Sequence, residues 1–266
     1  MRSMLQWFAA VVLMVGLGIP AQADPFFFTT GNPDGLIGMA SRPESADGSK
    51  IEIEAADDFI LQQPTLLYAA IFTGLMPPNF TPADIGQVKV EIYRVFPNDS
   101  DTARTPNVPT RTNSPSDVEF DGELALQDGA RTTADGSLSA TFVVLQLQYP
   151  VANSVLNGIN PLPNQTTGGD GPVSGWLTSF IVLFNTEFDL PPDHYFFVPQ
   201  VEVLNGLGDF LWVSAPHNPP QFAGDLQAWI RNSNLDPDWL RVGTDIVGGT
   251  TFNGSFSLIG ETLPGQ

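Results

Sequence analysis

QVKVEIYRVF, residues 87–96, is the stretch that decides the fold. One face of the segment carries Val88, Val90 and Ile92, and the other carries Lys89, Glu91 and Tyr93. Strict alternation of this kind is typical of a β-strand that packs one face on a core and leaves the other in water. We therefore expect an antiparallel strand whose face with Lys89 and Glu91 is solvated.

Strand patterns continue on both sides of this segment. Residues 51–54 alternate and 58–61 follow as a strand candidate. Residues 68–75 are mostly apolar and are predicted to form a strand that is buried on both faces or lies near a sheet centre. Residues 137–149 alternate again, and there we expect the apolar residues to point inward and the glutamines outward. The residues predicted to point inward are Val143, Leu145, Leu147 and Tyr149, and those predicted to point outward are Gln146 and Gln148.

The second half of the chain carries further strand signals and one weak helix signal. Residues 176–188 and 195–204 are predicted to form a hairpin around Pro191 and Pro192, with shorter strands at 210–215 and 251–259. Residues 226–232 are predicted to form one or two helical turns, with Asp225 as the N-cap.

These patterns predict an all-β protein with little helix. Roughly eight to ten strands separated by turn signals favour an antiparallel two-sheet sandwich of jelly-roll type. Two stretches rich in Pro, Asn and Gly, 98–117 and 157–175, are predicted to be long loops. No linker divides residues 24–266, so we expect a single domain there.

Composition limits the functions to consider. The chain has 29 acidic and 10 basic residues, a net charge of −19, and only two lysines, Lys50 and Lys89. A field of this sign repels nucleic acid and anionic lipid and suits divalent cations or basic partners, although acidity also serves solubility. The chain has no cysteine, which excludes disulfides and thiolate metal sites.

The N-terminus has the pattern of a secretory signal peptide. Arg2 precedes an apolar run of about 13 residues, which is shorter than the ~20 that a membrane-spanning helix needs, and Ala21-Gln22-Ala23 forms a small-residue cleavage site. We expect residues 1–23 to be removed, leaving a secreted protein, extracellular or periplasmic, with no membrane span.

Four segments together resemble a known group of proteins: ADDF at 56–59, VEIYRVFP at 90–97, NSVLNGINP at 153–161 and DPDWLRVGTD at 236–245. The chain resembles uncharacterised exported bacterial proteins, some relatives of which carry a C-terminal PEP-CTERM sorting tail linked to surface display and exopolysaccharide. The resemblance implies a β-rich extracellular protein and no particular activity. After Ile259 no apolar anchor or basic cluster follows, so we expect release, or attachment through a partner.

Calcium is the first candidate ligand. Hard cations bind several converging carboxylate and carbonyl oxygens, which a polar loop supplies. The candidate ligands in and after the first long loop are Asp99, Asp101, Asp117, Glu119 and Asp121. They lack EF-hand spacing, and a solvated acidic loop is the simpler explanation for them.

Carbohydrate is the second candidate ligand. Indole rings stack on sugar faces, and the candidates are Trp176, Trp212, Trp229 and Trp239. The apolar neighbours of Trp229 and Trp239 in the sequence favour a role in the core instead.

Catalysis has less support in the sequence. A glycoside hydrolase needs two carboxyl groups across a cleft, for which Asp236 with Asp238, or Glu187 with Glu202, are conceivable pairs. The chain has no G-x-S-x-G elbow, no phosphate-binding loop and no dinucleotide fingerprint. Its two histidines, His194 and His217, lack a nearby third zinc ligand in sequence.

Arg231 and Arg241 flank the acidic turn at Asp236 and Asp238. We expect them to pair with carboxylates, including that of Asp245, and to fix residues 226–245 onto the sandwich, because the arginine side chain binds carboxylates with two hydrogen bonds.

The sequence therefore predicts a secreted, non-catalytic binding or structural module of the cell envelope or extracellular matrix. Polysaccharide or a surface protein is the expected partner, and Ca²⁺ a stabilising ion. A carbohydrate-active hydrolase that uses an Asp/Glu pair is the alternative.

Overall fold

The computed structural model describes residues 23–96, 108, 112–120, 129–160, 162 and 164–263. The strands of the first half are β1 (Asp24–Thr29), β2 (Ile37–Ala40), β3 (Ile53–Leu61), β4 (Thr65–Met76), β5 (Ile85–Phe96), β6 (Ser114–Pro115), β7 (Ala130–Thr132), β8 (Leu138–Val151) and β9 (Asn153–Val155). Those of the second half are β10 (Val173–Leu190), β11 (Asp193–Val203), β12 (Leu211–Pro216), β13 (Trp229–Asn232), β14 (Leu240–Arg241), β15 (Phe252–Gly254) and β16 (Phe256–Thr262). Two short helical segments, η1 (Pro82–Asp84) and η2 (Val242–Val247), complete the elements.

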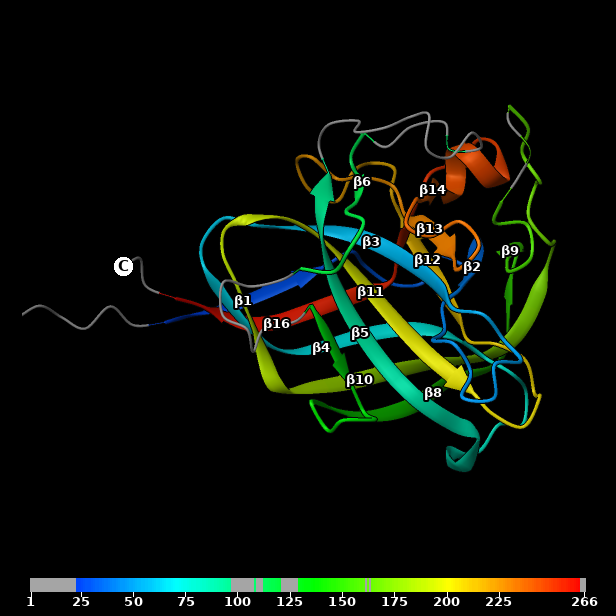
Figure 1. Cartoon of the computed structure of the whole chain (residues 1–266), viewed down its shortest axis with the longest axis horizontal. Helices are drawn as coiled ribbons and strands as arrows, with labels where there is room; N and C mark the ends of the chain where they lie inside the picture. Colours follow the sequence, from blue (N-terminus) through cyan, green and yellow to red (C-terminus); the bar gives the residue numbers. More distant parts are fainter. Residues whose placement is uncertain are drawn as a thin grey trace, which may run out of the picture.

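The strands form two sheets that pack face to face. The nine-stranded sheet runs β1-β16-β4-β12-β2-β9, with β10 on the other side of β4, β8 beyond β10, and β15 on β12. The seven-stranded sheet runs β14-β13-β3-β11-β5-β6, with β7 also on β5. In Figure 1 β5 and β11 of the second sheet run across β4 and β10 of the first. The predicted all-β two-sheet sandwich is confirmed.

The core lies between the sheets and is rich in phenylalanine. β4 carries no charged residue and pairs with β10, β16 and β12, so the strand predicted to be buried on both faces lies inside its sheet. Stacked rings tie the two sheets together, with Phe197 of β11 and Phe256 of β16 only 4.8 Å apart between centroids. On β5, Val88, Val90 and Ile92 face this core as predicted.

The expectation of a solvated second face on β5 is wrong. Glu91 and Tyr93 are each 1% exposed, and Lys89 is half-buried. A smaller cluster of side chains covers this outer face: Ala56, Tyr93, Phe196, Val198, Trp229 and Trp239. The residues that cover this face from β13 and the turn after it lie far along the chain. The sequence of residues 87–96 alone therefore could not predict that the face is buried.

Three further expectations are wrong. Val143, Leu145 and Leu147 of β8 are exposed, and Phe142 and Val144 face the core instead, because period-two alternation does not tell which face is buried when both are apolar. Residues 176–188 and 195–204 form no hairpin: β10 and β11 belong to different sheets, so the turn between them crosses the sandwich. Residues 229–232 are strand β13 and not helix, because they pair with β3.

Candidate functional site

A polar pocket of about 260 Å³ lies on the outer face of the seven-stranded sheet. Its lining residues are Glu52, Glu54, Lys89, Glu91, Tyr93, Asp117, Val118, Glu119, Arg231, Ser233 and Asp236. Six of these are carboxylic acids and two are basic, so the pocket is strongly acidic by composition. We call it the acidic pocket.

Strand register brings these side chains together. Arg231 on β13 lies opposite Glu54 on β3. Gln200 on β11 lies opposite Lys89 on β5, and because side chains two residues apart share a face, Glu91 projects from the same side as Lys89. Four strands that are distant in sequence thus contribute to one site.

Glu54 is the most firmly held of the carboxylates. Its Oε1 accepts hydrogen bonds from the Tyr93 hydroxyl at 2.8 Å and from Arg231 Nη2 at 3.1 Å, and its Oε2 accepts from Arg231 Nε. Arg231 also pairs with Asp236 at 2.8 Å and lies 4.3 Å over the Trp239 ring. Burial lowers the pKa of Arg231, but the nearby Glu54 carboxylate raises it by more. The net shift is upward, so Arg231 stays charged.

Lys89 lies between the other two glutamates. Its ammonium is 3.2 Å from Glu52 Oε1 and contacts Glu91 Oε1. Gln200 Nε2 donates to the same oxygen of Glu52 at 2.9 Å. One lysine therefore serves two carboxylates, and these two have no arginine of their own in the pocket lining.

Two buried oxygens at this place lack a hydrogen-bond donor within the described part of the chain. They are Glu91 Oε2 and Gln200 Oε1, in side chains that are 1% and 0% exposed. Burial, followed by repulsion from Glu54, raises the pKa of Glu91 well above its ordinary value. A buried acceptor without a donor is costly, so the site favours a proton or a positively charged ligand.

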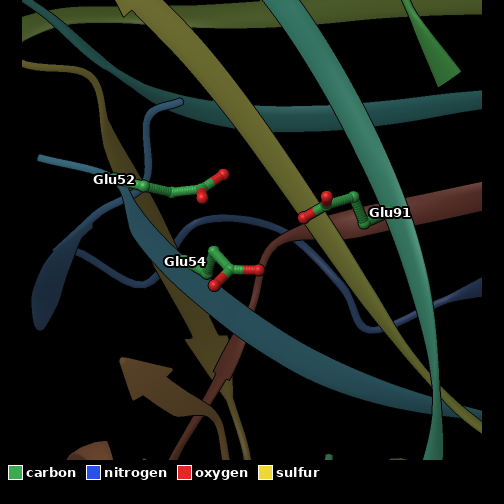
Figure 2. Close-up of side chains that lie close together, drawn as sticks. All are labelled: Glu52, Glu54 and Glu91. Carbon is green, nitrogen blue, oxygen red and sulfur yellow. The ribbon is translucent and has the colours of Figure 1, made fainter. Parts of the chain in front are cut away.

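Figure 2 shows the three glutamate side chains pointing toward one another, Glu52 and Glu54 from the start of β3 and Glu91 from β5. One carboxylate oxygen of each of Glu52, Glu54 and Glu91 lies within 4.8 Å of the others. Converging carboxylates with a nearby amide carbonyl form an all-oxygen donor set, which hard cations such as Ca²⁺ prefer.

The calcium prediction falls partly at this site. Asp117 and Glu119 line the acidic pocket, whereas Asp99, Asp101 and Asp121 lie outside the described residues. Sequence reasoning missed Glu52, Glu54 and Glu91. Their signal was present as acidic residues spaced by two on predicted strands, but such spacing is also what a solvated strand face shows.

The tryptophans offered as sugar platforms lie mostly in the interior. Trp212, Trp229 and Trp239 are at most 2% exposed, and Trp176 is half-buried against Phe80. With their faces covered by protein, the three buried rings have none open for stacking on a sugar.

The carboxylate pairs considered for hydrolysis are not brought together across a cleft. Asp236 is exposed and paired with Arg231, while Asp238 is buried. Glu187 lies on β10 and Glu202 on β11, in different sheets.

Arg241 has the expected partner. It forms a two-oxygen pair with Asp245, whose Oδ1 is 2.7 Å and Oδ2 3.0 Å from the guanidinium. This pair and the Arg231–Asp236 pair lie within the segment 229–245, and the Arg231 contacts to Glu54 tie that segment to β3.

A second titratable cluster lies further along β3 and includes both histidines. His194 Nε2 is 2.5 Å from Asp58 Oδ2, and His217 Nδ1 is 3.4 Å from Asp225 Oδ2. Burial raises the pKa of Asp58 to about 6 and that of Asp57 well above its ordinary value. Asp225 bonds Gln221 and Asn253 rather than capping a helix, so this cluster fastens the connection between β12 and β13.

Comparisons with family models, with curated proteins and with solved structures gave no match. Within the described residues, no helix has the length and apolar character needed to cross a membrane.

Proposed function

We propose that the protein is a non-catalytic binding module whose ligand site is the acidic pocket, and that the ligand is a divalent cation of the Ca²⁺ type. The observation that carries the proposal is the pair of buried, donorless oxygens, Glu91 Oε2 and Gln200 Oε1, beside three converging glutamates. A bound cation would give both oxygens a partner and would offset the excess of carboxylates.

The donor set favours calcium over other common ions. Zinc in proteins prefers nitrogen and sulfur ligands, but the sequence has no cysteine and no histidine lines this pocket. Magnesium requires near-ideal octahedral geometry and keeps most of its water, whereas calcium accepts irregular sets of six to eight oxygens. Carboxylates from the start of β3, from β5 and from the pocket rim, with water, suit the less demanding ion.

Lys89 competes with a bound cation for the carboxylates of the acidic pocket. Its ammonium now neutralises Glu52 and Glu91, and a dication must displace it or share these oxygens with it. We therefore expect moderate affinity, suited to the millimolar calcium outside cells, for which extracellular modules typically have dissociation constants of about 10⁻⁴–10⁻³ M.

Thermal unfolding with Ca²⁺ and with a chelator tests the proposal. A ligand that binds only the folded state raises the unfolding midpoint. We expect wild type to gain stability in Ca²⁺, Glu91→Gln to lose that gain, and Glu44→Gln to keep it, because Glu44 is an exposed glutamate outside the pocket. An unchanged wild-type midpoint at saturating Ca²⁺, or an equal gain in Glu91→Gln, would contradict the proposal.

Export and a place in the cell envelope belong to the same proposal. The signal-like N-terminus supports it. Polysaccharide or surface-protein partners remain a prediction.

The hydrolase alternative has weaker geometric support. Both oxygens of Glu54 are engaged by Arg231 and Tyr93, and Glu91 is 1% exposed, so neither carboxyl reaches out to a polysaccharide chain. Activity on polysaccharides that is lost in Glu91→Gln would favour this alternative.

A further inference from the structure

The outer face of the nine-stranded sheet carries apolar side chains in water. Phe27 of β1 is 66% exposed, Leu183 of β10 is 53% exposed and Val143 of β8 is 51% exposed. Ile259 of β16, Ile71 of β4 and Ile181 of β10 lie between them and are half-buried. We call this surface the apolar face.

Strand pairing shows that these residues share one surface. Phe27 lies opposite Ile259, Ile259 opposite Ala69, and Ala69 opposite Leu183, which makes one row across four strands. A second row contains Ile71 and Ile181, since these residues also pair directly. Val143 lies opposite Ser179, and Ser179 opposite Thr73, which makes a third row. Neighbours two residues apart on a strand project from the same side, so the three rows form one continuous patch.

We propose that the apolar face is the interface of a homodimer, in which two copies pack their nine-stranded sheets face to face. An apolar patch of this size is often a site of interaction. The polar residues between the apolar ones are small and neutral: Thr29, Ser257, Thr73, Ser179, Ser139 and Thr141.

Charge favours a second copy as the occupant. The chain carries a net charge of −19, so two copies repel each other wherever their carboxylates meet. The rows described above contain no charged side chain, and the acidic residues of these strands, such as Glu187 and Glu261, lie toward strand ends. The net charge repels an anionic membrane at every approach, and it leaves this uncharged face as the surface at which two copies can meet without opposing carboxylates.

The area is sufficient for a weak dimer. Five strands about 4.8 Å apart and seven residues of about 3.3 Å each give a face on the order of 500 Å². Two such faces bury on the order of 1,000 Å² together, at the lower limit for a specific interface. We therefore expect an equilibrium between monomer and dimer rather than an obligate dimer.

Sedimentation of the full mature chain between micromolar and submillimolar concentration tests the proposal. We expect wild type to move toward dimer mass with concentration, and Leu183→Glu combined with Val143→Glu to stay monomeric with unchanged circular dichroism. Both positions are more than half exposed, so the variant is expected to fold. Leu162→Glu, at an exposed leucine outside this sheet, is the matched control and is expected to dimerise.

Three results would overturn the proposal. Wild type could remain monomeric throughout the concentration range, or the double variant could dimerise as wild type does. Monomeric wild type that floats with vesicles of neutral phosphatidylcholine, but not in the double variant, would assign the face to lipid instead.

Discussion

Asp57 is a carboxyl group placed against the inner core of a sandwich. It is fully buried, Gly254 N donates to its Oδ2, and its Oδ1 has no donor among the described residues. The pKa of Asp57 is raised well above its ordinary value. Desolvation is the main cause, and repulsion from the neighbouring Asp58 and Asp225 adds to it. The folded protein thus holds a proton that the unfolded chain releases near pH ~4.

A group whose pKa is raised by folding makes the folded state less stable as pH rises. Raised folded-state pKa values at Asp57, Asp58 and Glu91 give a contribution to stability that is complete below about pH 4 and is lost as pH rises through each folded value, about 6 for Asp58. We expect Asp57→Asn to flatten the fall in unfolding free energy between about pH 4 and pH 8 by on the order of 1 kcal/mol, measured by urea unfolding.

Asp47→Asn is the matched control for that measurement. Hydrogen bonds from Ser49 and Ser45 lower the pKa of the exposed Asp47 to about 2, so its contribution is lost only as pH falls toward that value. This variant is expected to leave the profile above pH 4 unchanged. A profile of Asp57→Asn parallel to that of wild type would show that Asp57 is not the group responsible.

Lys89 competes with the proposed cation, so removing the lysine charge is expected to strengthen cation binding, whereas removing a glutamate weakens it. Lys89→Met is expected to bind Ca²⁺ several-fold more tightly, as measured by calorimetric titration, because Glu52 and Glu91 lose their ammonium partner. Lys50→Met is the control, since Lys50 pairs with Asp209 elsewhere. Weaker calcium binding by Lys89→Met would mean that the lysine builds the site instead.

At the scale of elements, β13 pairs with β3 along the backbone, and one arginine on β13 adds side-chain bonds between the two strands. Arg231 bonds Glu54, Tyr93 and Asp236, donates to the backbone carbonyls of Asp117 and Pro237, and lies over the Trp239 ring. Arg231→Met is expected to cost about 3–5 kcal/mol of unfolding free energy, because it leaves Glu54 buried with its charge uncompensated.

Arg94→Met provides the comparison, because Arg94 forms a half-exposed pair with Asp193 and such pairs contribute only about 0–1 kcal/mol. Equal losses in the two variants, measured by chemical unfolding, would contradict the assignment of Arg231 as the anchor of β13.

The strands differ in how well their own sequences predict them. The core face of β5 was predictable because alternation reports which residues share a face. Its second face was not, because Trp239 and Arg231 cover it from more than 100 residues away in the chain. On β8 both faces are apolar, so local sequence could not tell Val143 from Val144, and a dimer interface explains why the exposed side is apolar.

The candidate site was less predictable than the fold. Asp117 and Glu119 were singled out and line the acidic pocket, but the converging glutamates come from β5 and from the start of β3. Only tertiary pairing turns Glu52, Glu54 and Glu91 from strand-face residues into neighbours. Glu91 is buried only in the assembled sheet, and its burial is the reason that an unpaired oxygen there points to a ligand.

At the scale of the whole molecule, the two sheets present different outer surfaces. The seven-stranded sheet carries the acidic pocket, and the nine-stranded sheet carries the neutral apolar face. A dimer built through the apolar face would leave both pockets on its outside. Calcium and self-association are therefore expected to be independent, so Leu183→Glu combined with Val143→Glu should keep the calcium-induced rise in unfolding midpoint.

The location of the bound ion is the most direct test of the acidic pocket. Crystals grown with terbium as a calcium substitute would give an anomalous difference map in which the ion appears as a peak. The account predicts a peak within coordination distance of Glu52 and Glu91, close to Gln200. A peak only at other carboxylates, or none when calorimetry shows the protein to be saturated, would contradict it.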